Sequence, residues 1–121
     1  MSIAYTSKFI DLTDENINNT VNDLLAEIPG CTEVEHTPSL YATGRALSLN
    51  ICINERWYNV YIYPLRLFIR GTEVSLSRVE VDEYDPDDTP EGLPYRIPGM
   101  KGDENFTQLI KFVRDRVVTT V

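Results

Sequence analysis

The chain has 121 residues, of which 19 are acidic and 11 are Lys or Arg, so its formal net charge is -8. A hydrophobic content of 42% with only two cysteines excludes fibrous, disulfide-rich and fully disordered classes of protein. A chain of this length can bury one hydrophobic core but not two, so we expect a single domain over residues 1–121.

The first predicted element is a helix from Asp14 to Ile28. Its apolar residues recur at helical spacing and form one stripe, which consists of Ile17, Val21, Leu24, Leu25 and Ile28. Thr13 or Asp14 can cap the start of this helix, and the Pro-Gly pair at residues 29–30 ends it. Residues 31–44 are ambiguous, since they can hold a short edge strand but also contain two turn-like segments.

A strand is predicted from Ala46 to Ile53, because apolar residues alternate there with small or polar ones. The next two residues, 54 and 55, occupy a hairpin turn. A second strand, Trp57 to Tyr63, is rich in aromatic and β-branched residues. Pro64 cannot donate a ladder hydrogen bond, so this strand either ends there or continues as an edge strand.

The alternation resumes over residues 65–70, and Gly71 with Thr72 predicts a hairpin turn before a strand over residues 73–81. In this last strand the apolar phase changes between Leu76 and Val79, which predicts a β-bulge near Ser77 or Arg78.

Residues 84–102 contain four prolines and three glycines, and they predict a long loop. A closing helix is predicted from about Asp103, its cap, to Val118. The apolar stripe of this helix consists of Phe106, Leu109, Ile110, Val113 and Val117. Together these elements predict an α+β fold of two layers, in which N-terminal and C-terminal helices flank an antiparallel meander of three to four strands.

Sequence motifs of the common catalytic and cofactor-binding sites are missing from the chain. Cys31, His36 and Cys52 lack a fourth ligand at a spacing typical of zinc sites. We therefore expect no catalytic residue, no metal and no cofactor, and hence a protein that is not an enzyme.

No run of about 18 apolar residues is present, so we expect neither a membrane span nor a membrane partner. The first eight residues lack the pattern of a signal peptide, and we therefore expect a cytoplasmic location. In a reducing cytoplasm, Cys31 and Cys52 would be free thiols.

The negative charge is concentrated between Glu80 and Glu91, where seven of the twelve residues are acidic and none is basic. This run can be a solvated loop, a cation site without the EF-hand spacing, or a docking segment for a basic partner. The docking hypothesis assigns partner contacts to Asp82, Glu83, Tyr84, Asp85, Asp87, Asp88 and Glu91.

The middle of the chain is basic, with five arginines against two glutamates between residues 45 and 79. Aromatic and arginine side chains that coincide on an uncovered sheet face would form a second candidate surface. Its residues are Trp57, Tyr61, Tyr63, Arg66, Phe68 and Arg70. The alternative is that most of the tyrosines pack against the helices, with their hydroxyl groups at the rim.

These features predict a small acidic protein that occupies a basic surface of a partner protein, as inhibitors, immunity proteins and phage anti-defence proteins do. One alternative is that the sheet face binds a ligand or single-stranded nucleic acid. The negative net charge and the lack of lysine between residues 9 and 100 disfavour nucleic acid. Another alternative is self-assembly, as a structural or chaperone-like protein or a homodimer, through pairing of basic and acidic segments.

Overall fold

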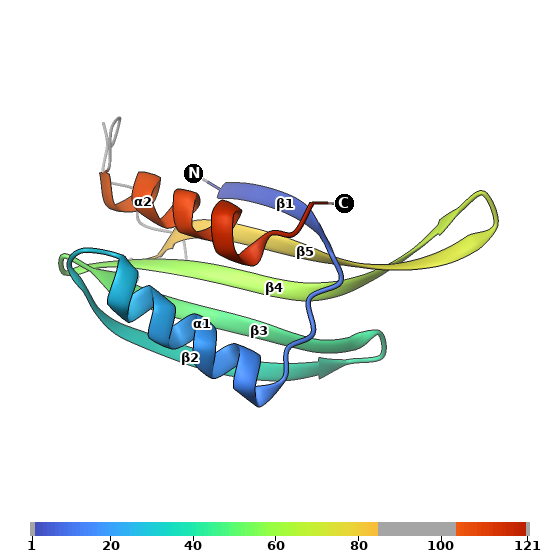
Figure 1. Ribbon diagram of the computed structural model, residues 1–121, viewed down its shortest axis with the longest axis horizontal. Coiled ribbons are helices and arrows are strands. Elements are labelled where there is room, and N and C mark those ends of the chain that lie inside the picture. Colours follow the sequence, from blue (N-terminus) through green and yellow to red (C-terminus); the bar gives the residue numbers. More distant parts are fainter. Residues whose placement is uncertain (1, 85–103, 121) are drawn as a thin grey trace, which may run out of the picture.

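The computed structural model describes residues 2–84 and 104–120. These residues form a five-stranded antiparallel sheet and two helices (Figure 1). In chain order the elements are β1 (Ser2–Lys8), α1 (Asp14–Glu27), β2 (Cys31–Tyr41), β3 (Gly44–Ile53), β4 (Arg56–Ile69), β5 (Thr72–Tyr84), α2 (Glu104–Phe112) and the π-helical segment η2 (Val113–Val117).

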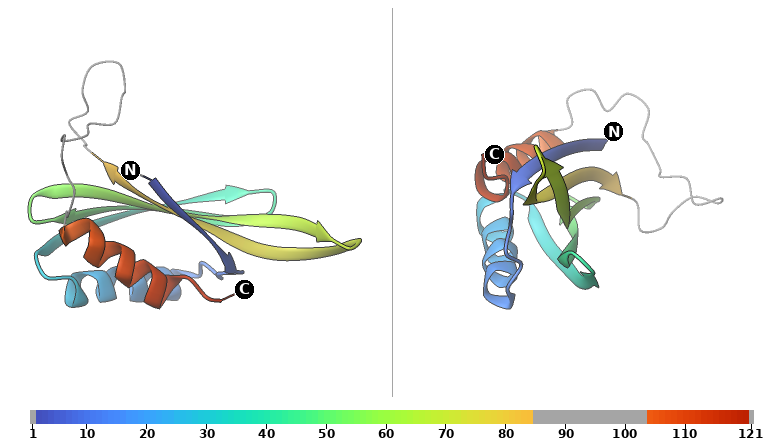
Figure 2. Two further views of the ribbon diagram at one scale, coloured as in Figure 1. Left: turned by 90° about the horizontal axis from the view of Figure 1, so that it is seen from above. Right: turned by 90° about the vertical axis from the view of Figure 1, so that its right-hand side faces the viewer.

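The strands lie in the order β1-β5-β4-β3-β2, and each neighbouring pair is antiparallel. Figure 2 shows that α1 and α2 lie side by side on one face of this sheet. We call this the helix face. Among the described residues no helix or strand lies against the other side, which we call the uncovered face. The predicted α+β class is confirmed, but the expected three to four strands are too few, and the described chain begins with a strand rather than a helix.

β1 is the strand that the sequence pattern did not predict. It pairs with β5 from Ser2 opposite Asp82 to Lys8 opposite Leu76. Only Ile3 and Tyr5 supply apolar alternation in this short segment, and both pack partly against the core. Such a short pattern carries little information by itself, so the strand conformation depends on the edge that β5 offers.

The ambiguous residues after α1 form β2, an edge strand that pairs with β3 along almost its whole length. Its register shifts between Cys31 and Glu33, where the chain enters the sheet. Most of its side chains are exposed, which explains why the segment shows no clear apolar period.

β4 runs through Pro64 without a break, although it is the middle strand of the sheet. Its pairing with β3 ends at Ile62 opposite Leu47, so Pro64 lies beyond the β3 ladder. The Pro64 carbonyl accepts a hydrogen bond from Thr43 Oγ1 at 3.4 Å, and its missing N–H faces the same side. The proline is tolerated because β4 is locally an edge strand at this position.

The predicted bulge near Ser77 or Arg78 is wrong, because the register of β5 is continuous there against both β4 and β1. Ser77 is a buried residue of the helix face, and its Oγ accepts a hydrogen bond from the Ile10 N–H at 2.9 Å. The apparent change of phase arises because a serine, rather than an apolar residue, continues the buried row of Val79 and Val81.

The predicted first helix is confirmed as α1, and Thr13 is its cap, with Oγ1 accepting from the Asn16 N–H at 3.1 Å. Ile17, Leu24 and Ile28 are buried, as their helical spacing predicts. Leu25 was expected on this stripe but is 41% exposed, because it lies one residue off the buried row.

The predicted closing helix is present as α2, followed by η2, in which the Val118 N–H donates to the Val113 carbonyl at 2.9 Å. Phe106, Leu109 and Val113 are buried as expected, and Phe112 joins them. The expected cap, Asp103, lies outside the described residues. Among those residues, no helix has the length and apolar character that crossing a membrane requires.

Two adjacent leucines of α1 test this assignment of the core. Leu24 is 1% exposed, so we expect Leu24→Ala to lower the free energy of unfolding by about 2–5 kcal/mol. Leu25→Ala is the matched control, and its effect should stay within about 1 kcal/mol. Urea denaturation followed by circular dichroism measures both, and equal losses would contradict the described packing of α1.

Candidate functional site

Large apolar side chains remain exposed mainly at one end of the sheet. Of the seven in the described residues, six lie where β1 ends, at the β2–β3 hairpin or at the β4–β5 hairpin. We call these six the apolar end, and they are Phe9, Leu40, Tyr41, Leu67, Phe68 and Ile69. The seventh, Leu25, lies on α1.

The β4–β5 hairpin projects beyond the rest of the sheet (Figure 1). The β3 ladder with β4 ends at Ile62, and the β1 ladder with β5 ends at Leu76. Within the described chain, residues 65–75 therefore pair only inside the β4–β5 hairpin, and we call them the arm. Arg70 and Gly71, with φ of 52° and 78°, form its turn, one residue earlier than predicted.

The tip of the arm is apolar on both of its faces. Leu67 and Ile69 share one parity of β4, whereas Phe68 has the other and therefore projects to the opposite side. Phe68 is 75% exposed, and its two neighbours are about half exposed. A row of three exposed large apolar residues is unusual on a protein surface that faces only water.

The β2–β3 hairpin lies beside the base of the arm. Thr43 reaches the Pro64 carbonyl, and the Tyr41 and Tyr61 hydroxyl groups share a hydrogen bond. This hydrogen bond raises the pKa of Tyr61 above its usual value. The same hairpin leaves Leu40 83% exposed, so the base of the arm adds apolar surface to the tip.

The charges around the apolar end are mostly positive, unlike those of the whole chain. Arg66 and Arg70 flank the three apolar residues of the tip, and Lys8 ends β1 beside the arm. Arg66 Nε forms an exposed ion pair with Glu73 Oε1 at 3.3 Å. A contact made here is therefore an apolar one with a basic rim.

The register divides the predicted aromatic and arginine set between two places. Trp57, Tyr61 and Tyr63 fall on the uncovered face, since the alternate residues Tyr58 and Ile62 are buried in the core. The rings of Tyr61 and Tyr63 lie with centroids 5.3 Å apart. These three aromatic residues therefore share one face of the sheet, outside the arm.

The other three residues of that set belong to the arm. Arg66 and Phe68 have the opposite parity of β4, and Arg70 lies in the turn. Sequence reasoning did not assign the other five residues of the apolar end to a site, which are Phe9, Leu40, Tyr41, Leu67 and Ile69. The available signal was the run of three large apolar residues between two arginines, next to a glycine turn.

Acidic residues accompany the aromatic residues on the uncovered face. Glu80 lies opposite Tyr61, and Asp82 lies opposite Asn59. Asn59 Nδ2 donates to Ser48 Oγ at 3.0 Å and to Asn50 Oδ1 at 2.9 Å, so its amide is already bonded within the face. Arg78 lies opposite Tyr63 on the same face, but its Nε forms an ion pair with Glu80 Oε1 at 3.3 Å. Phosphate contacts need basic groups, so two acidic residues and an arginine that is already paired give little support to nucleic-acid binding beside the tyrosines.

The acidic run begins at the other end of β5 from the arm. Asp82 lies on the uncovered face, whereas Glu83 has the parity of the helix face, opposite Tyr58. Tyr84 is the last residue of β5. The remaining predicted docking residues lie outside the described residues and are Asp85, Asp87, Asp88 and Glu91.

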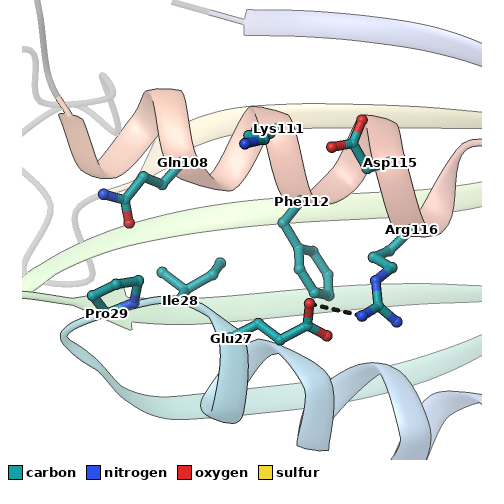
Figure 3. A pocket seen from close by; sticks show the side chains of 8 residues that line it. All are labelled: Glu27, Ile28, Pro29, Gln108, Lys111, Phe112, Asp115 and Arg116. Atoms are coloured by element: carbon teal, nitrogen blue, oxygen red, sulfur yellow. Dashed lines mark hydrogen bonds and ion pairs between the residues drawn. The ribbon is translucent and has the colours of Figure 1, made fainter.

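A groove of about 400 Å³ lies between the end of α1 and α2 (Figure 3). Ile28, Pro29 and Phe112 supply its apolar part, and its rim carries charges of both signs. Arg116 Nη2 pairs with Glu27 Oε1 at 2.8 Å across the groove. The groove therefore lies where the ends of the two helices meet, and a partly exposed ion pair spans it.

The described residues contain no group of three or more His, Cys, Asp or Glu side chains that could hold a metal ion. His36 lies in a shallow hollow beside Asp14 and Arg45, which form an ion pair at 2.8 Å. Cys31 and Cys52 are free thiols. Burial raises the pKa of the Cys31 thiol above its usual value.

The raised pKa predicts slow alkylation of Cys31, because the thiolate is the reactive form. In the Cys52→Ser variant, Cys31 is the one remaining cysteine. We expect iodoacetamide to modify it more slowly in the folded variant than in the same variant unfolded in urea, at one mildly alkaline pH. Mass spectrometry over time measures both rates, and equal rates would contradict the burial of this thiol.

Comparison with known proteins gives no significant match to this chain, whether to protein-family models, to curated proteins or to solved structures.

Proposed function

We propose that this chain is a non-enzymatic protein-binding module whose contact surface is the apolar end. The observation that carries the proposal is that, among the described residues, six of the seven exposed large apolar side chains lie at one end of the sheet. Exposed apolar side chains are common singly, but a concentration of them marks an interaction surface.

The size of the surface supports this function. A fully exposed large side chain has an accessible surface on the order of 200 Å². With their exposed fractions, the six side chains together present about 700 Å² of accessible surface. One side of a standard protein interface covers roughly 800 Å². The apolar end thus provides most of the area that one protein contact needs.

The composition of the surface supports it as well. Phe68 is an aromatic residue at the centre of the tip, and Arg66 and Arg70 lie on either side of it. Aromatic residues and arginine are enriched among the residues that contribute most to protein binding. We therefore assign the anchor of the contact to Phe68.

A second candidate contact is the acidic run between Glu80 and Glu91, which we propose docks on a basic surface of a partner. Seven acidic residues within twelve favour it, and Asp82 and Glu83 place its start at the end of β5 away from the arm. This contact would be electrostatic and would weaken with added salt, in contrast to an apolar contact.

Affinity capture from the cells that carry the gene tests the proposed function. Tagged wild-type protein should retain specific partners, and Phe68→Asp should reduce their recovery at least tenfold, as expected for the loss of an anchor residue. Leu25→Asp is the matched control. Leu25, like Phe68, is an exposed large apolar residue, but it lies on α1, away from the apolar end. Quantitative mass spectrometry measures the recovery.

A further variant separates the two candidate contacts. The triple change Asp85→Lys, Asp87→Lys and Asp88→Lys should leave recovery unchanged if the apolar end makes the contact. Reduced recovery of partners by this variant, together with full recovery by Phe68→Asp, would instead assign the contact to the acidic run. Full recovery in all variants would overturn both contacts.

A further inference from the structure

We propose that the apolar end binds a second copy of this chain, in a two-fold dimer in which each arm lies on the base of the partner's arm. This inference rests on the proposed function, because it names the partner of the same surface. It follows from the shape and the area of the apolar end and from the features of the two edge strands, and the charges of the apolar end predict how the dimer responds to salt.

The apolar end contains a part that projects beyond the sheet and a part that does not. Leu67, Phe68 and Ile69 form the tip of the arm, whereas Phe9 and the β2–β3 hairpin lie near its base (Figure 1). In a two-fold contact the same patch serves both subunits, so the tip of each arm can lie against the base of the other arm.

The area of the patch fits such a dimer. Two apolar ends of about 700 Å² each give a total close to the roughly 1,600 Å² of a standard interface. The arm itself would gain from the contact, because an isolated two-stranded ribbon is only marginally stable in water. Residues 65–75 have no third strand beside them in the described chain.

The edge strands offer a poorer route to self-association. β2 carries Pro38 within its length and exposes Glu33 and Glu35, and both features oppose pairing with another strand. At the end of β1, the Lys8 N–H already donates to the Thr119 carbonyl at 3.2 Å. Contact through the arms avoids these obstacles.

The charges predict how the dimer responds to salt. Lys8 and Arg70 lie at the rim of each apolar end, so the contact brings like charges near each other. Screening by salt should therefore leave the dimer unchanged or strengthen it. Head-to-tail pairing of the acidic run with the arginine-rich segment of another copy would show the opposite dependence.

Sedimentation velocity over a series of protein concentrations, at low and at physiological salt, tests the proposal. Wild-type protein should sediment as a dimer of the 13.9 kDa chain at both salt concentrations. Phe68→Asp should be monomeric, and the matched control Leu25→Asp should remain dimeric. Circular dichroism of both variants verifies that each is folded.

Hydrogen exchange gives an independent readout that needs no variant. The amides of residues 65–75 in wild-type protein should exchange more slowly as the concentration rises, while those at the exposed start of α1 should not change. A monomer at all concentrations, a dimer that survives Phe68→Asp, or a dimer that dissociates in salt would each overturn the proposal.

The other occupants of the apolar end are also distinguished. Wild-type protein that stays monomeric but binds vesicles of phosphatidylcholine and phosphatidylserine would assign the tip to a lipid surface. Monomeric protein that still captures a different protein through Phe68 would overturn the dimer and leave the proposed function intact. A dimer that captures no other protein would limit that function to self-association.

Discussion

The alternation of side chains along β4 is the constraint on which the rest of this molecule depends. From Tyr58 to Ile62, every second residue enters the core beneath the two helices, and the intervening ones face away. The helices cover β4 only over this inner part. Where the strand continues past Pro64 into the arm, the same alternation leaves apolar side chains uncovered on both faces.

This constraint also explains which parts of the fold were predictable. Ala46 to Ile53 and Trp57 to Tyr63 have a clear local period, and both were identified as strands. β1 has no such period, because it owes its conformation to β5, a strand distant in sequence. From the local sequence, Pro64 predicts the end of a strand. The strand continues because the pairing of β4 with β3 has already ended at Ile62, so no β3 hydrogen bond is lost at the proline.

The candidate site was only partly accessible to sequence reasoning for the same reason. Phe68, Arg66 and Arg70 were identified from composition, but placing them on one face with Trp57 required a change of phase at Pro64. β4 has a continuous register there, so no such change occurs. The exposure of Leu40 beside the arm depends on how two hairpins meet, which no local pattern encodes.

Arg70 lowers the conformational stability of the turn at the tip of the arm. Its φ of 52° belongs to a backbone region that glycine and asparagine occupy readily, whereas a long side chain is disfavoured there. Glycine would make the turn more stable, yet it would remove a positive charge from beside Phe68. The hairpin therefore keeps a positive charge at its exposed tip at the expense of a less stable turn, and a design that optimised the turn alone would remove that charge.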